Sequence, residues 1–317
     1  MFPAPWLSLV ASALTLVGAW VADLDPAPLL DDSMPAVVAS AADSKQDAED
    51  SEDAEEYEID DDLDDAVDLD DDDDDDFFGP CREWGNHDWV VACKVLELEV
   101  ASPGSGPIQV DTGAYGGVRV EGWDRPGISV RARVRARAKS RADAEALADR
   151  VKLTARGSRI GSTGTSDGDG SRCYVEYRIR VPRKSNLALE TENGPLSVED
   201  VNGTMILKSQ NGPIALKDLA GAVEARTENG PLSVRLGGSR WQGAGLDAAT
   251  DNGPVSLVVP RGYSARLQSG TINGPHIDDH SIHLSQGGRH PVVKLGQGGP
   301  PVRVVTDNGP FSMKRSR

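Results

Sequence analysis

The sequence predicts an all-β fold, a parallel β-helix (β-solenoid) with Asn-Gly-Pro corner repeats, preceded by a disordered acidic N-terminal segment. Three observations predict it. Glycine recurs every nine residues over residues 190–236, and apolar residues spaced two apart follow each glycine. A stretch before this repeat is too acidic to bury a core.

The N-terminus contains no charged side chain over residues 1–22, and its apolar centre at 6–22 has the length of a signal-peptide core. Small residues that suit cleavage precede two positions, so cleavage is possible after Ala19 or as late as after Ala41. No Lys or Arg precedes the apolar stretch, and its length reaches the lower limit for spanning a bilayer, so a retained anchor stays open. Export to the periplasm, the cell surface or the extracellular space is expected.

Residues 23–76 are expected to form a disordered acidic linker. Residues 43–76 alone hold 22 acidic side chains against one lysine, a net charge of −21, whereas residues 77–317 carry a net charge of +7. The overall charge of −18 therefore combines two parts of opposite sign. The acidic run lacks the glycine-turned spacing of a calcium loop, so at most weak Ca²⁺ binding is expected.

Residues 77–94 are predicted to be a disulfide-closed segment that leads into the folded domain. Cys81 and Cys93 would pair in an oxidising compartment, leaving Cys173 outside the pair. The alternative to this disulfide is that Cys81 and Cys93 both remain reduced thiols. No CxxC pair or other zinc-ligand spacing occurs in the chain.

The nine-residue repeat aligns the glycines at positions 194, 203, 212, 221 and 230. Apolar pairs such as Leu196 and Val198 would lie on one face of a strand. A second period of eighteen residues, seen in Thr191, Ser209 and Thr227, indicates that each turn of the solenoid contains two nine-residue segments. So short a turn cannot bury its own apolar face, and successive turns must stack around a shared core.

The Asn-Gly pairs are predicted to form the corners, because both residues tolerate a positive φ, and the proline that often follows suits a strand start. A meander of β-hairpins with Asn-Gly turns is the competing interpretation. The predicted corner residues are Asn193, Gly194, Asn211, Gly212, Asn229, Gly230, Asn252, Gly253, Asn273, Gly274, Asn308 and Gly309.

The segment before the repeat is predicted to form the opening coils of the same solenoid, with an insertion. One short helix is expected at about 142–151, and a mobile Gly-rich loop at 157–170. The expected strands cover residues 95–100, 108–110, 118–120, 128–138 and 174–181.

Three stretches carry a resemblance to a known family: "GGVRVEGWDRPGISVRARV", "SRADAEALADRV" and "YRIRVPRKSNLALETENGPLSVEDVNG", followed by serial T-x-N-G phrases. Together they resemble the bacterial "putative adhesin" family of adhesin-like domains of unknown function, over roughly residues 95–314. The resemblance implies a β-helical domain, here assigned to 95–317, in the cell envelope or outside it. It implies no catalytic residues, and the acidic segment is not part of the family pattern.

A row of alternating cations is the sharpest candidate binding feature, because on a strand it would place positive charge along one face and Ala or Val along the other. The row consists of Arg131, Arg133, Arg135, Arg137, Lys139 and Arg141. It would suit a polyanion such as an acidic polysaccharide, lipid phosphates or nucleic acid, and the acidic residues 43–76 of the same chain could screen it. The alternatives are a solvated charged face or a guarded sheet edge, with the acidic segment a simple spacer.

Two other groups of side chains are weaker candidates. His276, Asp278, Asp279, His280 and His283 could ligate zinc or nickel, but no convincing helical pair occurs among them and a strand with His283 outward is favoured. Glu190, Glu199, Asp200, Glu224 and Glu228 would be the carboxylates of a polysaccharide-active enzyme, yet charges on an outer solenoid face are expected anyway.

The sequence thus predicts a non-enzymatic envelope or secreted interaction protein that binds a surface polymer or an envelope protein and needs no cofactor or metal. No nucleophile elbow, phosphate-cradling glycine loop or metalloprotease spacing occurs. A self-assembling scaffold, and hence a homo-oligomer, is the alternative within binding. A polysaccharide-active β-helix enzyme is the alternative from another class.

Overall fold

The computed structural model describes residues 89–102, 104, 106–113, 115–165, 171–278 and 290–316. All of them belong to one compact unit, Ile59–Arg317. The expected signal segment (1–22), the acidic linker (23–76) and Cys81 lie outside the described residues. Within the described part, the chain has no helix that combines the length and the apolar character needed to cross a bilayer.

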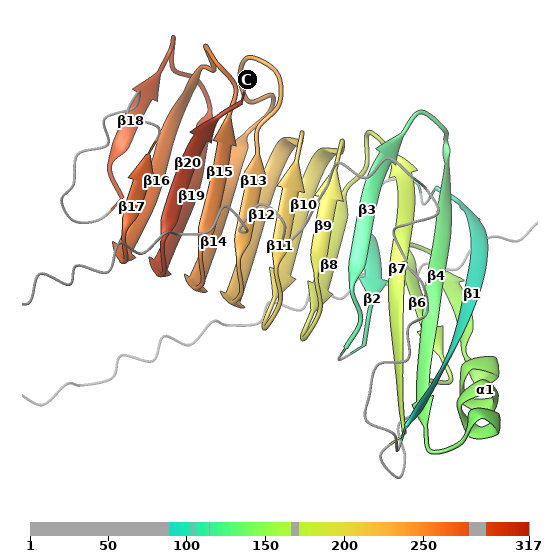
Figure 1. The fold of residues 1–317 in the computed structure, drawn as a ribbon. Coiled ribbons are helices and arrows are strands. Elements are labelled where there is room, and N and C mark those ends of the chain that lie inside the picture. Colours follow the sequence, from blue (N-terminus) through green and yellow to red (C-terminus); the bar gives the residue numbers. More distant parts are fainter. Residues whose placement is uncertain are drawn as a thin grey trace, which may run out of the picture. The chain divides into compact units, whose positions relative to one another are not determined.

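The described chain is all-β apart from one helix (Figure 1). Its elements are β1 (Val90–Ala101), β2 (Ile108–Asp111), β3 (Val118–Trp123), β4 (Gly127–Ala138), α1 (Arg141–Arg150), β5 (Lys152–Arg156), β6 (Arg159–Thr163), β7 (Arg172–Pro182), β8 (Leu187–Thr191), β9 (Leu196–Glu199), β10 (Asn202–Ser209), β11 (Ile214–Lys217), β12 (Ala220–Asn229), β13 (Leu232–Arg235), β14 (Gly245–Asn252), β15 (Val255–Val259), β16 (Ala265–Asn273), β17 (His276–Asp278), β18 (Val292–Leu295), β19 (Pro301–Asn308) and β20 (Phe311–Arg315).

The strands form two ten-stranded mixed sheets. Sheet A runs β1-β4-β7-β3-β9-β11-β13-β15-β20-β17, and sheet B runs β18-β16-β19-β14-β12-β10-β8-β2-β6-β5. From β8 to β15 the chain alternates between the sheets, so each pair of consecutive strands contributes one strand to each. The inward side chains of both sheets share one core, in which Tyr177, Leu207 and Phe311 are fully buried.

We term two consecutive strands, one in each sheet, a coil. Successive coils pair in parallel over the repeat. Met205 lies opposite both Leu187 and Val223, and Ile214 lies opposite both Leu196 and Leu232, an offset of eighteen residues in each case. This offset matches the eighteen-residue period of the sequence. Parallel pairing also excludes a hairpin meander for these coils, because adjacent strands of a hairpin run antiparallel.

The coils do not stack in chain order at either end. The β2/β3 coil lies between the β6/β7 and β8/β9 coils, and the final β19/β20 coil lies between β14/β15 and β16/β17 (Figure 1). The C-terminal strands are therefore flanked on both sides by earlier parts of the chain. Two sequence predictions fail nearby. Strands β1 and β4 pair antiparallel rather than as opening coils, whereas β7 pairs antiparallel with β4 and in parallel with β3. The expected loop at 157–170 contains β6.

Helix α1 begins where the cation-rich strand ends. The Ser140 side chain caps it by accepting a hydrogen bond from the Asp143 amide at 3.1 Å. Its buried residues Ala144, Leu147 and Ala148 face β1 and β4. The helix, predicted at 142–151, thus covers the inner side of the first two strands of sheet A.

The corner glycines are required for a reason other than the one expected. None of the corner asparagines has a positive φ, and among the corner glycines only Gly309 does, at 152°. A Cβ on Gly212 would instead lie 2.2 Å from the carbonyl oxygen of Gly194, and one on Gly230 would lie 2.3 Å from that of Gly212. Each of these corner glycines therefore lies so close to the backbone of a neighbouring coil that a side chain does not fit.

A ladder of asparagine side chains runs along the same corners. The Nδ2 of Asn211 donates to Oδ1 of Asn193 at 3.1 Å, and Asn229 donates to Asn211 at 3.0 Å. The ladder continues through residues 252, 308 and 273 in stacking order, with distances of 2.9–3.1 Å. The asparagine ladder follows the order in which the coils stack. It does so even at β19/β20, where the stacking order differs from the order of the coils along the chain.

Replacing a corner glycine is expected to destabilise the protein. Gly212→Ala should lower the free energy of unfolding by about 3 kcal/mol, because the new methyl group must displace backbone that is packed on both sides. Gly104→Ala is the control, since a Cβ there meets nothing within 4 Å, and should change the stability by less than about 0.5 kcal/mol. Urea denaturation of both variants measures the difference, and equal stabilities would contradict the close-approach account.

Candidate functional site

The predicted cation row lies on β4 with its side chains directed outward. Its arginines are half-buried, whereas Ala132, Val134 and Ala136 between them are fully buried in the core. The row is shorter than predicted, because the capped helix starts directly after the strand. Lys139 lies in the bend, and Arg141 lies on α1, where its Nε is 3.0 Å from Glu145.

Neighbouring strands extend this charge into a surface that we term the arginine face. It comprises the outward side chains of β1, β4, β7 and β3. Eight of these are arginines and four are glutamates: Arg119, Arg131, Arg133, Arg135, Arg137, Arg172, Arg178 and Arg180, with Glu97, Glu99, Glu121 and Glu176. The surface thus carries an excess of four positive charges.

Arginines lie directly opposite one another at two levels of the arginine face, where a level is a row of paired residues that runs across adjacent strands. Arg131, Arg178 and Arg119 occupy directly opposite positions on three adjacent strands, and Arg137 lies opposite Arg172. Like charges directly opposite each other destabilise a sheet. Between these levels, Arg133 lies opposite Glu176 and donates to it from Nε at 2.8 Å. The arginines of the first level also have carboxylates nearby: Glu97 lies 3.5 Å from Arg131, Glu121 lies 3.5 Å from Arg178 and Glu199 lies 3.7 Å from Arg119. The arrangement therefore sets arginines opposite one another at two levels and places carboxylates beside those of the first.

A hollow of about 330 Å³ opens at the first of these levels. Ser129 lies between Glu99 and Arg180 in the register, and its short side chain leaves room for the longer ones around it. The lining holds the guanidinium groups of Arg131, Arg178 and Arg180 against the carboxylates of Glu97 and Glu99. Guanidinium groups bind carboxylate, sulfate and phosphate oxygens in a planar, two-pronged geometry, so the hollow can accept an anionic group.

Aromatic rings lie at the second level. The guanidinium carbon of Arg137 is 4.5 Å from the centre of the Trp89 ring, and that of Arg172 is 5.6 Å from the Tyr115 ring. Tyr115 also contacts Tyr174 edge-on at 5.8 Å. Such cation–π contacts hold Arg137 and Arg172 in place.

Sequence reasoning missed the arginines of β7 and β3. A signal was present, because Arg172, Glu176, Arg178 and Arg180 alternate with apolar residues just as the β4 row does. The sequence alone could not show that β7 lies beside β4 in the sheet. Strands β4 and β7 are separated by the helix and two strands of the other sheet, yet they pair over nine positions.

The other candidate residues are not gathered into a site. Glu199 pairs with Lys217 at 2.9 Å on sheet A, and Asp200 pairs with Arg183 at 3.0 Å at a corner, whereas Glu190, Glu224 and Glu228 lie on strands of sheet B. The expected enzymatic carboxylates are therefore divided between the sheets. Of the metal candidates, Asp279, His280 and His283 lie outside the described residues.

Within the described ranges, no group of three possible metal ligands occurs. The ring of His276 instead contacts Phe311, with the ring centres 5.0 Å apart. Cys93 is disulfide-bonded, and Cys173 is a buried thiol. The expected partner of Cys93, Cys81, is outside the part of the chain that the structure describes.

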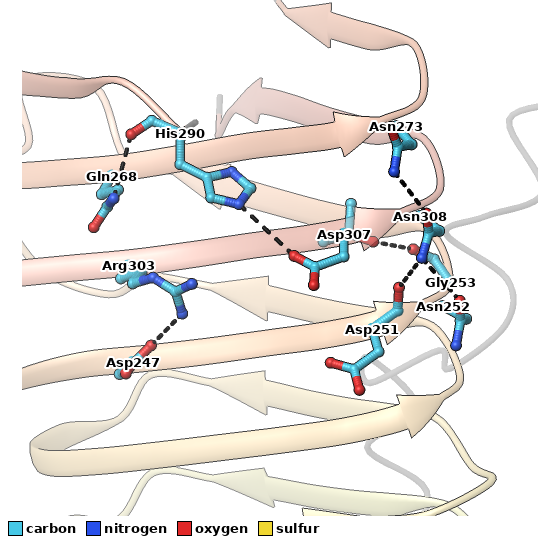
Figure 2. Close-up of polar contacts among 11 residues, drawn as sticks. Asp247, Asp251, Asn252, Gly253, Gln268, Asn273, His290, Arg303, Asp307 and Asn308 are labelled. Atoms are coloured by element: carbon cyan, nitrogen blue, oxygen red, sulfur yellow. Dashed lines mark hydrogen bonds and ion pairs between the residues drawn. The ribbon is translucent and has the colours of Figure 1, made fainter. Parts of the chain in front are cut away.

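Figure 2 shows a polar network on the outer side of sheet B near the C-terminus. Arg303 donates to Asp247 at 2.8 Å, and Arg226 binds the same carboxylate. Burial alone would raise the pKa of Asp247, but the two arginines hold that pKa below its ordinary value. His290, whose side chain is 8% exposed, lies 4.0 Å from Asp307. Burial and the nearby Arg303 lower the pKa of His290.

Comparisons with known proteins identify no family. No family model matches the chain, and no curated protein matches it. Among solved structures, a "putative cell adhesion protein" from Clostridium sporogenes is 10% identical, with 70% of this chain and 100% of that chain covered at a TM-score of 0.41.

Two further solved structures are similar to the same share of the chain. A "putative adhesin" from Bacteroides fragilis is 7% identical, with 97% of that chain covered at a TM-score of 0.30. A "putative lipid binding protein" from Parabacteroides distasonis is 10% identical, with 96% of that chain covered at a TM-score of 0.28. At these TM-scores the likeness carries no inference about what this chain binds.

The environment of His290 predicts a pH dependence of stability. Because its pKa is lower in the folded protein than in the unfolded chain, the unfolded chain binds the proton more readily, and stability falls as the pH falls below about 6.5. The His290→Gln variant should therefore lose less stability than the wild type between pH 7.5 and pH 5.5. Denaturation curves at both pH values measure the two losses, and equal losses would show that His290 does not contribute.

Proposed function

We propose that this chain is an exported, adhesin-like β-solenoid protein that binds an anionic polymer through the arginine face and catalyses no reaction. The observation that carries the proposal is the excess of positive charge on β1, β4, β7 and β3, with like charges opposite each other at two levels. A surface that served only solubility would gain nothing from this costly arrangement.

The solenoid assignment is supported by the parallel coils. Their eighteen-residue offset, their alternation between two sheets and their shared core correspond to a stack in which each coil contacts only its neighbours. The permuted order at both ends and the antiparallel strands β1, β4 and β18 would close the stack. The solenoid then acts as a rigid support that fixes the spacing of the outward side chains.

The spacing of the two arginine levels suits an extended polymer. Arg131 and Arg137 are six residues apart on one strand, which corresponds to about 20 Å. A polymer with repeated carboxylate, sulfate or phosphate groups would contact both levels at once, and the two contacts would strengthen each other. The protonated guanidinium groups would remain charged at any physiological pH, so salt rather than pH would control binding.

The acidic residues 43–76, outside the described part of the chain, carry the complementary charge. We infer that they compete with the polymer for the arginine face. A chain without residues 43–76 would then bind polyanions more tightly than the full chain at low salt, with the difference shrinking as salt is added. Equal affinities at low salt would mean that the acidic segment is a spacer.

The arginine face is tested by a double substitution at its first level. Arg131→Gln combined with Arg178→Gln should weaken binding of alginate and heparin by at least about tenfold, or about 1.4 kcal/mol, at low salt. The control is Arg261→Gln combined with Arg266→Gln, which removes the same charge from exposed positions elsewhere and should change the affinity less than about twofold.

Isothermal titration calorimetry at several salt concentrations, with dextran as the uncharged comparison, measures these affinities. Equal weakening in both double variants would mean that net charge alone governs binding. If neither polyanion binds at low salt to the full chain or to the chain without residues 43–76, the proposed function is wrong.

A further inference from the structure

The outward side of sheet B carries a second hollow, of about 500 Å³, that the arginine face does not use. It extends over β6, β2, β8 and β10, and we term it the sheet B groove. Its lining includes Gln109, Asp111, Arg159, Glu190, Ile206 and Lys208. Its volume lies within the range of about 300–1,000 Å³ that is usual for ligand sites.

The groove exists because a small residue separates long ones in the register. Ala188 lies between Gln109 and Ile206 at one level of the sheet, so its methyl group forms the floor while the neighbours form the walls. Arg159 lies opposite Gln109 on the far side and donates to its Oε1 at 3.2 Å. This hydrogen bond orients the amide of Gln109 at the edge of the groove.

The next level supplies charges of both signs. Asp111 lies opposite Glu190, which in turn lies opposite Lys208. With Glu192 and Arg159 the lining holds three carboxylates against two cations. A polyanion would be repelled by this balance, whereas carboxylate acceptors beside amide, guanidinium and ammonium donors suit a ligand rich in hydroxyl groups.

One wall of the groove is apolar where a polar residue would be expected. The outward positions of β10 are Asn202, Thr204, Ile206 and Lys208, and Ile206 is 44% exposed. Together with the floor at Ala188 it offers an apolar patch next to hydrogen-bonding groups. The C–H side of a sugar ring fits such a patch while its hydroxyl groups reach the polar side chains.

We propose that the sheet B groove binds a short segment of an uncharged glycan. An apolar ligand would bury the carboxylates without partners, which is costly, and an anionic one would meet them directly. The groove and the arginine face lie on the outward sides of different sheets, so one flat surface cannot occupy both. The protein would then connect an uncharged glycan to an anionic polymer.

The experiment titrates the full chain with maltohexaose, cellohexaose and mannohexaose, followed by calorimetry and by saturation-transfer NMR. At least one hexasaccharide is expected to bind, with little dependence on salt because no charge is neutralised. Ala188→Phe, which fills the floor, should weaken that binding at least tenfold. Ala222→Phe is the matched control, because Ala222 faces outward on β12 outside the groove lining, and it should leave the affinity within about twofold of the wild type.

Each outcome decides the inference separately from the proposed function. If none of the three hexasaccharides binds at 10 mM, or if Ala188→Phe binds as the wild type does, the uncharged-glycan site is wrong. Should Ala188→Phe fail to fold by circular dichroism, Ile206→Thr together with Glu190→Gln, both at outward positions, replaces it with the same expected loss. The Arg131→Gln and Arg178→Gln double variant should bind the hexasaccharide normally, because those residues lie on the other sheet.

Discussion

The close contact between successive corner backbones is the constraint on which the rest of the structure depends. At Gly194, Gly212 and Gly230, each Cα lies against the carbonyl of the coil before it, leaving no space for a side chain. The asparagine ladder and the buried Thr227 and Thr250, whose hydroxyl groups donate to corner carbonyls at 3.0 and 2.9 Å, add hydrogen bonds at the same place. Coils held this closely have only one register, and that register fixes the outward side chains of their strands.

Both candidate surfaces depend on strand register, which the stacked corners set for the sheet B groove and the antiparallel pairing of β4 with β7 sets for most of the arginine face. The arginine face exists because Arg131, Arg178 and Arg119 fall at one level of sheet A. The sheet B groove exists because Ala188 falls between two longer side chains. Neither surface comes from one contiguous stretch of sequence. A shift of β8 by a single residue would turn Ala188 toward the core and abolish the sheet B groove.

Much of the repeat could be predicted from the sequence, because its determinants are local. The eighteen-residue period corresponds to the observed strand offsets, and the helix was placed within a residue of its observed bounds. The stacking order could not be predicted, since the coil that ends the chain pairs with β15 and β17 by contacts that no local pattern specifies. The role of the corner glycines was misjudged for a related reason: single-chain turn preferences do not include the neighbouring coil. Arg178 and Arg119 were missed because they matter only through their position beside Arg131, on strands that are far apart in the sequence.

The permuted order offers the most direct test of this account, because Ser312 of β20 should lie between Ser256 of β15 and Ile277 of β17. Directly opposite strands bring Cα atoms within the range of about 4.4–6.8 Å that a disulfide requires, whereas strands two apart are separated by about 9.6 Å. The measurement is disulfide formation, followed by mass spectrometry, in a Ser256→Cys and Ser312→Cys variant and in a Ser256→Cys and Ile277→Cys variant. The account predicts a cross-link between positions 256 and 312 and none between 256 and 277. A cross-link between 256 and 277 alone would contradict it, because it would place the coils in chain order.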